Sequence, residues 1–374
     1  MIADASFTQA VKYTGSKRAL LPHILALTQT VQPRTVFDGF SGSTRVSQAY
    51  AKTGYTVYAN DIAVYSEVFN TAFLLNRRDP ESYRPLIDHL NALEPVDGWF
   101  TEHYGGDENF PGPETSGPKK PGLKKPWQKK NTRKLDAIRE EIDRLNLDKI
   151  ERAVLITSLI LALDKVDSTL GHHVSYLNGW SPRSYGDLKL ELPRLWINRQ
   201  NNVVMRDDVF AAARQLPDHA GLAYLDPPYG SNNDKMPPSR VRYASYYHLW
   251  TTICLNDRPE LFGKAQRRAD TSDAKSASVF EDFRRGPSGR FVVIEALDKL
   301  IGEIRAEHII LSYSSGGRAT AGELYEVLNA HGTIITVEEI NHKKNVMAQM
   351  KWTQNWIRDR EEKNVEFLFL MKKR

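Results

Sequence analysis

The sequence predicts a doubly wound α/β fold, interrupted by a mainly helical insertion. Strands alternate with helices twice, before residue 62 and again after residue 200. Strand, glycine turn, helix, strand and acid follow one another in the first alternation, and this order opens a doubly wound sheet. Residues 62–199 have mainly helical spacing. We therefore expect a core made of residues 1–61 and 200–374 and an insertion made of residues 62–199.

The first alternation contains two predicted helices and two predicted strands. Helical spacing runs over residues 17–27, and residues 35–38 (TVFD) predict a short strand that ends in a turn. Residues 43–52 again have helical spacing, and residues 55–59 (YTVYA) predict a second strand that runs into Asp61.

The second alternation adds further strands and helices. Strands are predicted at residues 202–205, 222–225, 308–312, 333–337 and 365–370. Helices are predicted at residues 209–216, 290–305 and 323–330. Ligands of an open α/β sheet bind outside the carboxyl ends of its strands. Several of these strand ends carry an acid, namely Asp38, Asp61, Asp207 or Asp208, and Asp226. Their common position predicts one ligand-binding cleft.

The insertion contains a basic and irregular stretch, residues 101–134. Gly and Pro recur up to residue 131 among few apolar residues, which predicts an exposed loop. Residues 119–134 carry eight Lys or Arg and no acid, and the whole chain has a net charge of +5. A localised basic arm suits a polyanion such as nucleic acid, and a solubilising loop is the alternative. Further on, residues 135–164 give the clearest helical pattern.

The composition excludes several classes of protein. A chain of 374 residues with 41% apolar and 26% charged residues is typical of a globular protein. The longest dense apolar run, residues 153–163, is too short for a transmembrane helix, and the first residues lack the pattern of a secretory signal. The single cysteine, Cys254, excludes an internal disulfide framework and a multi-cysteine zinc site. We therefore expect a cytoplasmic protein.

Residues 40–44, Phe-Ser-Gly-Ser-Thr, form a turn of small residues between a strand and a helix. Such a turn lets a ligand approach the backbone at the N-terminus of the helix. It matches neither the dinucleotide-binding glycine fingerprint nor a phosphate-binding lysine loop. Asp61 follows at the distance where α/β folds commonly bind ribose hydroxyls, and a helix N-cap is the alternative.

Residues 226–229, Asp-Pro-Pro-Tyr, directly follow a predicted strand. The two prolines restrict the backbone and place a carboxylate beside an aromatic ring. A carboxylate and a backbone carbonyl can accept both N–H bonds of an amino group on a flat heterocycle and favour a pyramidal nitrogen. The ring can stack on a base that has swung out of the duplex. A stiff loop with a surface tyrosine is the alternative.

Together these motifs resemble those of the Dam-like adenine-N6 DNA methyltransferases. Residues 12–17 (KYTGSK) are similar to the group's Lys-aromatic-x-Gly-x-Lys motif. Residues 40–44 resemble its Phe-x-Gly-x-Gly turn, with Thr44 in place of the last glycine. Asp61 matches its ribose-binding acid, and residues 226–229 match its catalytic motif. The resemblance covers residues 11–62 and 200–374.

The resemblance implies a Rossmann-like methyltransferase fold, the cofactor S-adenosylmethionine and an adenine flipped out of double-stranded DNA. It implies direct in-line transfer of the methyl group, with neither a metal nor a covalent intermediate. The implied catalytic residues are Asp226, Pro227, Pro228 and Tyr229. The implied cofactor contacts are Tyr13, Lys17, Asp38, Phe40, Ser41, Gly42, Ser43, Asp61, Asp226, and Asp207 or Asp208, of which we favour Asp207.

The helical insertion occupies the place of the group's target-recognition region. We predict DNA contacts from six of its basic residues: Lys124, Lys125, Lys129, Lys130, Arg183 and Lys189. Trp127 lies among the lysines of the basic arm. Tyr243, Tyr246 and Tyr247 could line a base pocket, but a helix face packed on the core is favoured.

The sequence therefore predicts a sequence-specific DNA methyltransferase that modifies adenine N6 at the nucleoid, without a membrane. A cognate restriction endonuclease or a solitary epigenetic role fits equally well, and the oligomeric state stays open. Methylation of cytosine N4 or of RNA adenine is one alternative, and Asp226 favours DNA adenine over cytosine. A catalytically silent DNA-binding module is another, against which the intact tetrapeptide argues.

Overall fold

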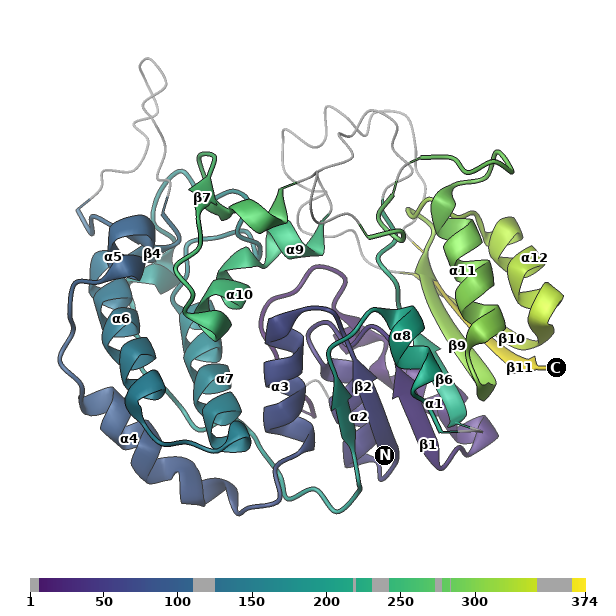
Figure 1. The fold of residues 1–374 in the computed structure, drawn as a ribbon, viewed down its shortest axis with the longest axis horizontal. Coiled ribbons are helices and arrows are strands. Elements are labelled where there is room, and N and C mark those ends of the chain that lie inside the picture. Colours follow the sequence, from purple (N-terminus) through teal and green to yellow (C-terminus); the bar gives the residue numbers. More distant parts are fainter. Residues whose placement is uncertain are drawn as a thin grey trace. The chain divides into compact units, whose positions relative to one another are not determined.

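The computed structural model describes residues 7–109, 125–217, 220–230, 242–272, 278–282, 284–341 and 365–374 (Figure 1). Its main sheet consists of β1 (Thr35–Asp38), β2 (Thr56–Asn60), β5 (Val203–Met205), β6 (Ala220–Leu225), β9 (Ala306–Ser314), β10 (Gly332–Asn341) and β11 (Val365–Lys373). The strand order is β10-β11-β9-β6-β1-β2-β5. Strand β6 is parallel to β1 and β9, and β2 is parallel to β5, whereas β11 is antiparallel to β9 and β10. This arrangement confirms the predicted α/β class with a Rossmann-like sheet.

The helices of the described residues connect most of these strands, and several of them lie in the chain between β2 and β5. They are α1 (Leu21–Val31), α2 (Arg45–Lys52), α3 (Val64–Leu74), α4 (Arg84–Ala92), α5 (Trp99–Tyr104), α6 (Lys129–Arg144), α7 (Lys149–Lys165), α8 (Val209–Arg214), α9 (Tyr243–Tyr246), α10 (His248–Leu255), α11 (Val292–Glu303) and α12 (Ala321–His331). Two small sheets pair β3 (Gly105–Gly106) with β4 (Trp127–Gln128) and β7 (Leu261–Phe262) with β8 (Arg267–Arg268). None of the helices described here has the length and apolar character to cross a membrane.

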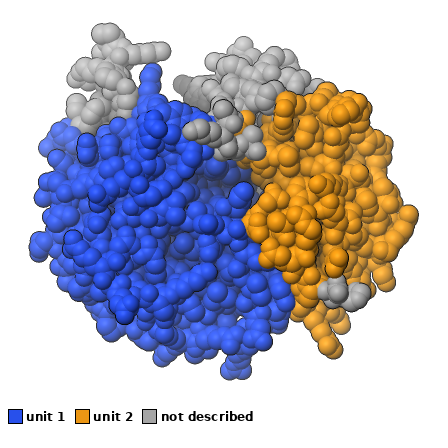
Figure 2. Space-filling view, in the orientation of Figure 1, with its two compact units in different colours: residues 1–22, 41–206, 243–276 blue, residues 23–40, 207–242, 277–374 orange. Residues whose placement is uncertain are grey.

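The chain contains two compact units (Figure 2). Unit 1 comprises Met1–Pro22, Ser41–Arg206 and Tyr243–Ser276. Unit 2 comprises His23–Phe40, Asp207–Arg242 and Ala277–Arg374. Within unit 1, α3 packs on β2, β5 and α7, so two strands of the sheet group with the helices of the predicted insertion. The division into a core and an insertion at residues 62–199 remains a prediction from the sequence.

The predicted helix at residues 135–164 is two helices, α6 and α7. Asp148 explains the break because its side chain accepts hydrogen bonds from the backbone N–H groups of Ile150 and Glu151, at 2.8 and 2.9 Å. The side chain of Glu151 accepts from the N–H of Asp148 in return, at 2.9 Å. This capping box begins a new helix, although the apolar pattern continues across it. The helices of the predicted insertion end at α7, earlier than predicted. Residues 166–202 contain the 3-10 turn Pro182–Tyr185 and an isolated β-bridge between Thr169 and Tyr176.

The basic stretch is only in part the exposed loop that the sequence predicted. Among its described residues, α5 runs to Tyr104, β3 pairs with β4, and α6 begins at Lys129. Gly106 permits Trp180 to lie close to β3, because a Cβ there would lie 2.8 Å from the ring of Trp180. Lys124, like the other basic residues before it in the arm, lies outside the described residues.

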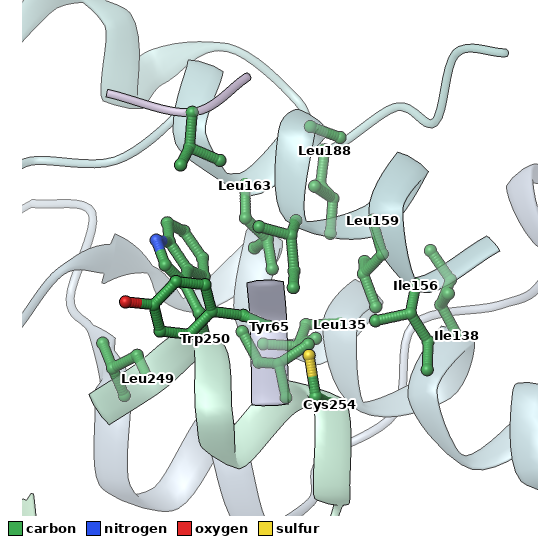
Figure 3. Packing of buried hydrophobic residues seen from close by; sticks show 14 of the residues in the cluster. Tyr65, Leu135, Ile138, Ile156, Leu159, Leu163, Leu188, Leu249, Trp250 and Cys254 are labelled. Atoms are coloured by element: carbon green, nitrogen blue, oxygen red, sulfur yellow. The ribbon is translucent and has the colours of Figure 1, made fainter. Parts of the chain in front are cut away.

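A large apolar cluster between α3, α6, α7 and α10 forms the core of unit 1 (Figure 3). Its labelled members in Figure 3 are Tyr65, Leu135, Ile138, Ile156, Leu159, Leu163, Leu188, Leu249, Trp250 and Cys254. Trp127 belongs to the same cluster and is fully buried. Its Nε1 donates to the carbonyl oxygen of Leu163 at 3.1 Å, and its ring centroid lies 6.1 Å from that of Trp250. The sequence predicted an exposed loop over these residues, but Trp127 is a core residue.

Three histidines are buried in the same unit: His172, His173 and His248. The ring of His173 stands nearly perpendicular to that of Trp250, with centroids 4.5 Å apart. His248 Nε2 lies 3.2 Å from the carbonyl oxygen of His173. Burial lowers the pKa of His248 to about 3 and the pKa of His173 well below its ordinary value. Both rings are therefore neutral at pH 7.

We expect the free energy of unfolding to fall as the pH drops below about 6.5, where histidines of the unfolded chain take up protons. The folded chain protonates His248 only near pH 3, so this residue alone removes about 1.4 kcal/mol per pH unit between those values. Urea unfolding at pH 7, 6 and 5 measures the slope. His248→Gln should make the slope shallower by that amount. An equal slope in wild type and His248→Gln contradicts this account.

Candidate active site

In unit 1, the small-residue turn is tied to the end of β2. The N–H and the hydroxyl of Ser41 both donate to the carbonyl oxygen of Asn60, at 2.9 and 2.7 Å. The N–H of Gly42 donates to Asp61 Oδ2 at 2.7 Å. Helix α2 begins directly after the turn, at Arg45. The turn and the acid after β2 are therefore held together at the start of a helix, as the sequence predicted.

Thr44 occupies the position at which the resembling turn motif has its last glycine. Its φ is +67°, in the left-handed region that glycine adopts without cost and a β-branched residue rarely adopts. The side-chain amide of Gln48 donates to the hydroxyl of Thr44 at 2.8 Å, and the N–H of Thr44 donates to the carbonyl oxygen of Ser41 at 2.6 Å. These contacts hold Thr44 where the resembling motif has glycine.

Tyr13 faces this turn within unit 1. A Cβ on Gly42 would lie only 3.2 Å from the Tyr13 ring, so the glycine permits their close approach. The Tyr13 ring stacks on Tyr247, with centroids 4.4 Å apart and an interplanar angle of 14°. Tyr13 Oη lies 3.2 Å from Tyr65 Oη. Tyr247 is fully buried, as favoured for this helix face, and its contact with Tyr13 was not predicted.

The environment of Asp61 suits a hydrogen-bond acceptor. Asp61 Oδ1 accepts from the N–H of Ala63 at 2.9 Å, while Oδ2 accepts from Gly42. Burial raises the pKa of Asp61 above its ordinary value, and these backbone N–H groups oppose the shift. Each carboxylate oxygen retains a lone pair that can accept a ligand hydroxyl. Lys17, another predicted cofactor residue, is buried, and its Nζ donates to the carbonyl oxygen of Gly15 at 3.1 Å.

In unit 2, the Asp-Pro-Pro-Tyr tetrapeptide directly follows β6. Strand β6 is parallel to β1, with Asp38 opposite Tyr224. Asp38 and Asp226 therefore lie at the same edge of these paired strands, as predicted for acids at strand ends. Asp38 is fully buried.

The carboxylate and the phenol of the tetrapeptide are in contact. Tyr229 Oη donates to Asp226 Oδ1 and also lies 2.6 Å from Glu366 Oε1. The Tyr229 ring packs on Tyr313, with centroids 4.8 Å apart. Burial, followed by the charges of Asp226 and Glu366, raises the pKa of Tyr229 well above its ordinary value. The phenol is therefore protonated at neutral pH. This is the side-by-side placement of carboxylate and ring that the two prolines predicted.

An aromatic cluster that the sequence did not predict lies beside α8 in unit 2. The Phe40 ring contacts Phe280 edge-on, with centroids 5.1 Å apart, and Phe280 stacks on Phe210 at 6.0 Å. Asp208 caps α8, since its carboxylate accepts from the N–H of Phe210 at 2.9 Å. Asp207 accepts from the N–H of Asp208 at 3.0 Å. Asp207 Oδ2 also accepts from the side-chain amide of Gln215 at 2.9 Å, so both carboxylates are engaged and the preference for Asp207 stays a prediction.

Three of the predicted DNA-contacting residues have partners within unit 1. Lys125 Nζ contacts the backbone carbonyl at the end of α5, and burial lowers the pKa of Lys125. Lys130 Nζ lies 2.6 Å from Asp187 Oδ1, and Arg183 Nε donates to the buried carboxylate of Asp167 at 2.8 Å. These contacts use part of the charge that was predicted to face DNA.

Two other predicted DNA-contacting residues, Lys129 and Lys189, are exposed. Lys129 borders a cleft of about 810 Å³ that is lined mainly by acids and small residues. The acids of this cleft are Asp97, Glu102, Asp107 and Glu108. Lys189 lies two residues from each of the exposed acids Asp187 and Glu191, so both exposed lysines have carboxylates nearby.

Comparison with known proteins identifies the family. The D12 class N6 adenine-specific DNA methyltransferase family matches residues 13–281. Modification methylase StsI of Streptococcus sanguinis is 29% identical over 355 residues, which cover 89% of this chain and 48% of that protein. Type II methyltransferase M.FokI of Planomicrobium okeanokoites is 26% identical over 329 residues, which cover 86% and 47%. Type II methyltransferase M2.HphI of Haemophilus parahaemolyticus is 24% identical over 390 residues, which cover 97% and 98%.

The chain spans about half the length of the StsI and FokI enzymes that it matches. The family match extends over more than half of the chain, from Tyr13 through the small-residue turn and Asp61 to beyond the tetrapeptide at residues 226–229. It confirms the resemblance to adenine-N6 DNA methyltransferases. This chain belongs to the D12 class of N6 adenine-specific DNA methyltransferases.

Proposed function

We propose that this chain transfers a methyl group from S-adenosylmethionine to N6 of an adenine that is flipped out of double-stranded DNA at a specific sequence. The observation that supports this most directly is the contact between Asp226 and Tyr229 immediately after β6. Family membership supports the reaction class, and the intact tetrapeptide argues against a silent DNA-binding module.

The tetrapeptide carries the chemistry of the amino group in this proposal. An exocyclic amine is a weak nucleophile, because its lone pair is delocalised into the ring. Two N–H bonds, donated to Asp226 and to the carbonyl oxygen of Pro227, favour a pyramidal nitrogen whose lone pair points out of the base plane. The Tyr229 ring stacks on the base and holds this orientation. A new N–C bond then forms as the C–S bond breaks, and Asp226 accepts the proton that the nitrogen loses.

The residues present fit S-adenosylmethionine. Asp61 is fixed by two backbone N–H groups and has lone pairs for ribose hydroxyls, and Gly42 lets the Tyr13 ring lie directly against the turn. When bound, the cofactor supplies an electrophilic methyl group on a sulfonium.

The names of the relatives support a role in restriction and modification. They are a modification methylase and Type II methyltransferases. We therefore propose that this chain protects nucleoid DNA against a cognate restriction endonuclease. If the chain is instead a solitary epigenetic methyltransferase, the same modified base is expected, but no cognate nuclease that cuts the unmodified site.

One experiment tests the reaction, the base and the site together. The protein is incubated with methyl-labelled S-adenosylmethionine and mixed-sequence DNA, and the modified nucleosides are separated and then mapped by sequencing. N6-methyladenine at one short sequence is expected. N4-methylcytosine, label only in RNA, or no label in any nucleic acid would contradict the proposal.

Lys189→Gln should reduce the salt dependence of DNA binding. If the exposed Lys189 neutralises one phosphate, the slope of log affinity against log salt falls by about 0.9. Lys130→Gln is the matched control, because Asp187 already pairs with Lys130 and less charge is available to DNA. Fluorescence anisotropy between 50 and 300 mM salt, about the range where such slopes are measured, gives both values. Equal slopes in wild type and Lys189→Gln exclude Lys189 from the DNA interface.

A further inference from the structure

Glu366 is a buried acid in an otherwise apolar part of β11. It lies opposite Ser314 of β9 and Ile340 of β10, so pairing with both neighbouring strands fixes the backbone of Glu366. Its side chain is only 5% exposed. Burial of a carboxylate costs free energy unless hydrogen bonds compensate it, so the hydrogen-bond partners of Glu366 indicate its role. Two hydroxyls contact Glu366 Oε1: Ser312 Oγ at 2.7 Å and Tyr229 Oη at 2.6 Å.

The phenol of Tyr229 therefore lies between two carboxylates. It has a single proton, yet both Asp226 Oδ1 and Glu366 Oε1 are within hydrogen-bond distance of its oxygen. A hydrogen bond to Asp226 Oδ1 takes one acceptor position of the carboxylate that the proposed reaction uses for the amino group. A hydrogen bond to Glu366 leaves that position to the base.

We propose that Glu366 is a positioning residue that holds the hydroxyl of Tyr229, so that Asp226 can accept the amino group of the target base. The proposal rests on the function proposed above. Ser312 donates to the same oxygen of Glu366 and holds the carboxylate in place. Tyr313 supports the other side of the arrangement, since its ring packs on Tyr229 and its hydroxyl lies 3.4 Å from the Tyr229 carbonyl oxygen. The aromatic ring is thus fixed at its face, its backbone and its hydroxyl.

A double-mutant cycle separates this role from a merely structural one. Single-turnover methylation is measured for wild type, Glu366→Gln, Tyr229→Phe and the double variant. Glu366→Gln should slow methylation by about tenfold to a hundredfold, the range for a lost hydrogen bond to a charged group, with little change in the KM for DNA. In the Tyr229→Phe background the same change should have less than about a twofold effect, because there is no hydroxyl left to hold.

Glu339→Gln is the matched control. Glu339 is exposed on the neighbouring strand β10, opposite Phe367, and the substitution should leave the rate unchanged. If Glu366→Gln slows methylation equally with and without the Tyr229 hydroxyl, Glu366 acts only through the stability of β11 and the proposal is overturned.

A spectroscopic measurement tests the contact without activity. In protein labelled with 3-fluorotyrosine, the fluorine resonance that disappears in Tyr229→Phe belongs to Tyr229. This resonance should shift in Glu366→Gln and stay in place in Glu339→Gln. An unchanged resonance in Glu366→Gln overturns the proposal. If the resonance shifts in Glu366→Gln but the wild-type protein methylates no DNA, the Glu366 contact is supported and the proposed function is rejected.

Discussion

Asp226→Ala should abolish methyl transfer and leave binding of the cofactor weakened but measurable. Without the carboxylate, the target amine loses the acceptor that draws its lone pair out of the ring, so the loss should be at least about a thousandfold. Single-turnover transfer of label into DNA measures the reaction, and calorimetric titration with S-adenosylmethionine measures the binding. Wild-type turnover by this variant would remove the catalytic assignment of Asp226.

The structure provides controls for this result. Tyr229 Oη also contacts Glu366, and the backbone N–H of Arg318 donates to the Tyr229 carbonyl oxygen at 3.1 Å, so the tetrapeptide should keep its place without Asp226. Asp298→Ala removes another acid of unit 2, on α11, whose Oδ1 lies 2.8 Å from His331 Nε2. It should leave turnover close to that of wild type. Thermal unfolding of all the variants shows that a loss of activity is not a loss of fold.

The parallel strands and their polar ends could be predicted from local sequence. The strand predicted at residues 35–38 has the observed bounds of β1, and β2, β5 and β6 begin or end within two residues of their predictions. Apolar runs that stop at an acid or a glycine turn mark these strands clearly. Strands β9 and β10 extend beyond the residues predicted for them, because pairing with neighbouring strands recruits flanking residues. Ala306 of β9 pairs with β6, whereas Ser314 of β9 and residues 338–341 of β10 pair with β11.

The local half of each candidate site could be predicted, but its distant partners could not. Asp226 and Tyr229 are three residues apart and two prolines fix their geometry, whereas Glu366 contacts Tyr229 from 137 residues away. A single acid within the apolar run at residues 365–370 was the available signal for Glu366. The stacking of Tyr247 on Tyr13 is likewise a tertiary contact, and local sequence spacing could not predict it.

Composition misled the interpretation of the basic arm. Lysines around Trp127 suggested a solvated segment, but the tryptophan ring contacts α7 and α10, which are distant in sequence. Lys125 and Lys130 have internal oxygen partners, so a run of positive charge also serves the fold. Burial of the arm's last residues is a tertiary effect, and the charge pattern alone could not indicate it.

Trp127→Ala should lower the free energy of unfolding by about 3–5 kcal/mol, the usual cost of deleting a buried aromatic side chain. The fully buried ring lies 6.1 Å from Trp250 and 6.3 Å from His173, centroid to centroid, so its removal leaves a cavity in the core of unit 1. Its Nε1 also satisfies the carbonyl oxygen of Leu163, which would lose its side-chain partner. Urea unfolding at pH 7 measures the difference from wild type.

Trp127→Phe is the control, because phenylalanine keeps most of the apolar contacts and loses only the indole N–H. It should cost clearly less than alanine. The salt slope of DNA affinity should be unchanged in both variants, measured where they are folded, because a buried ring contacts no phosphate. Full stability of Trp127→Ala together with weaker DNA binding would instead place the tryptophan on the DNA-binding surface. A deletion that is meant to test the basic arm must therefore stop before residue 125, since the following residues build β4, the core and the first turn of α6.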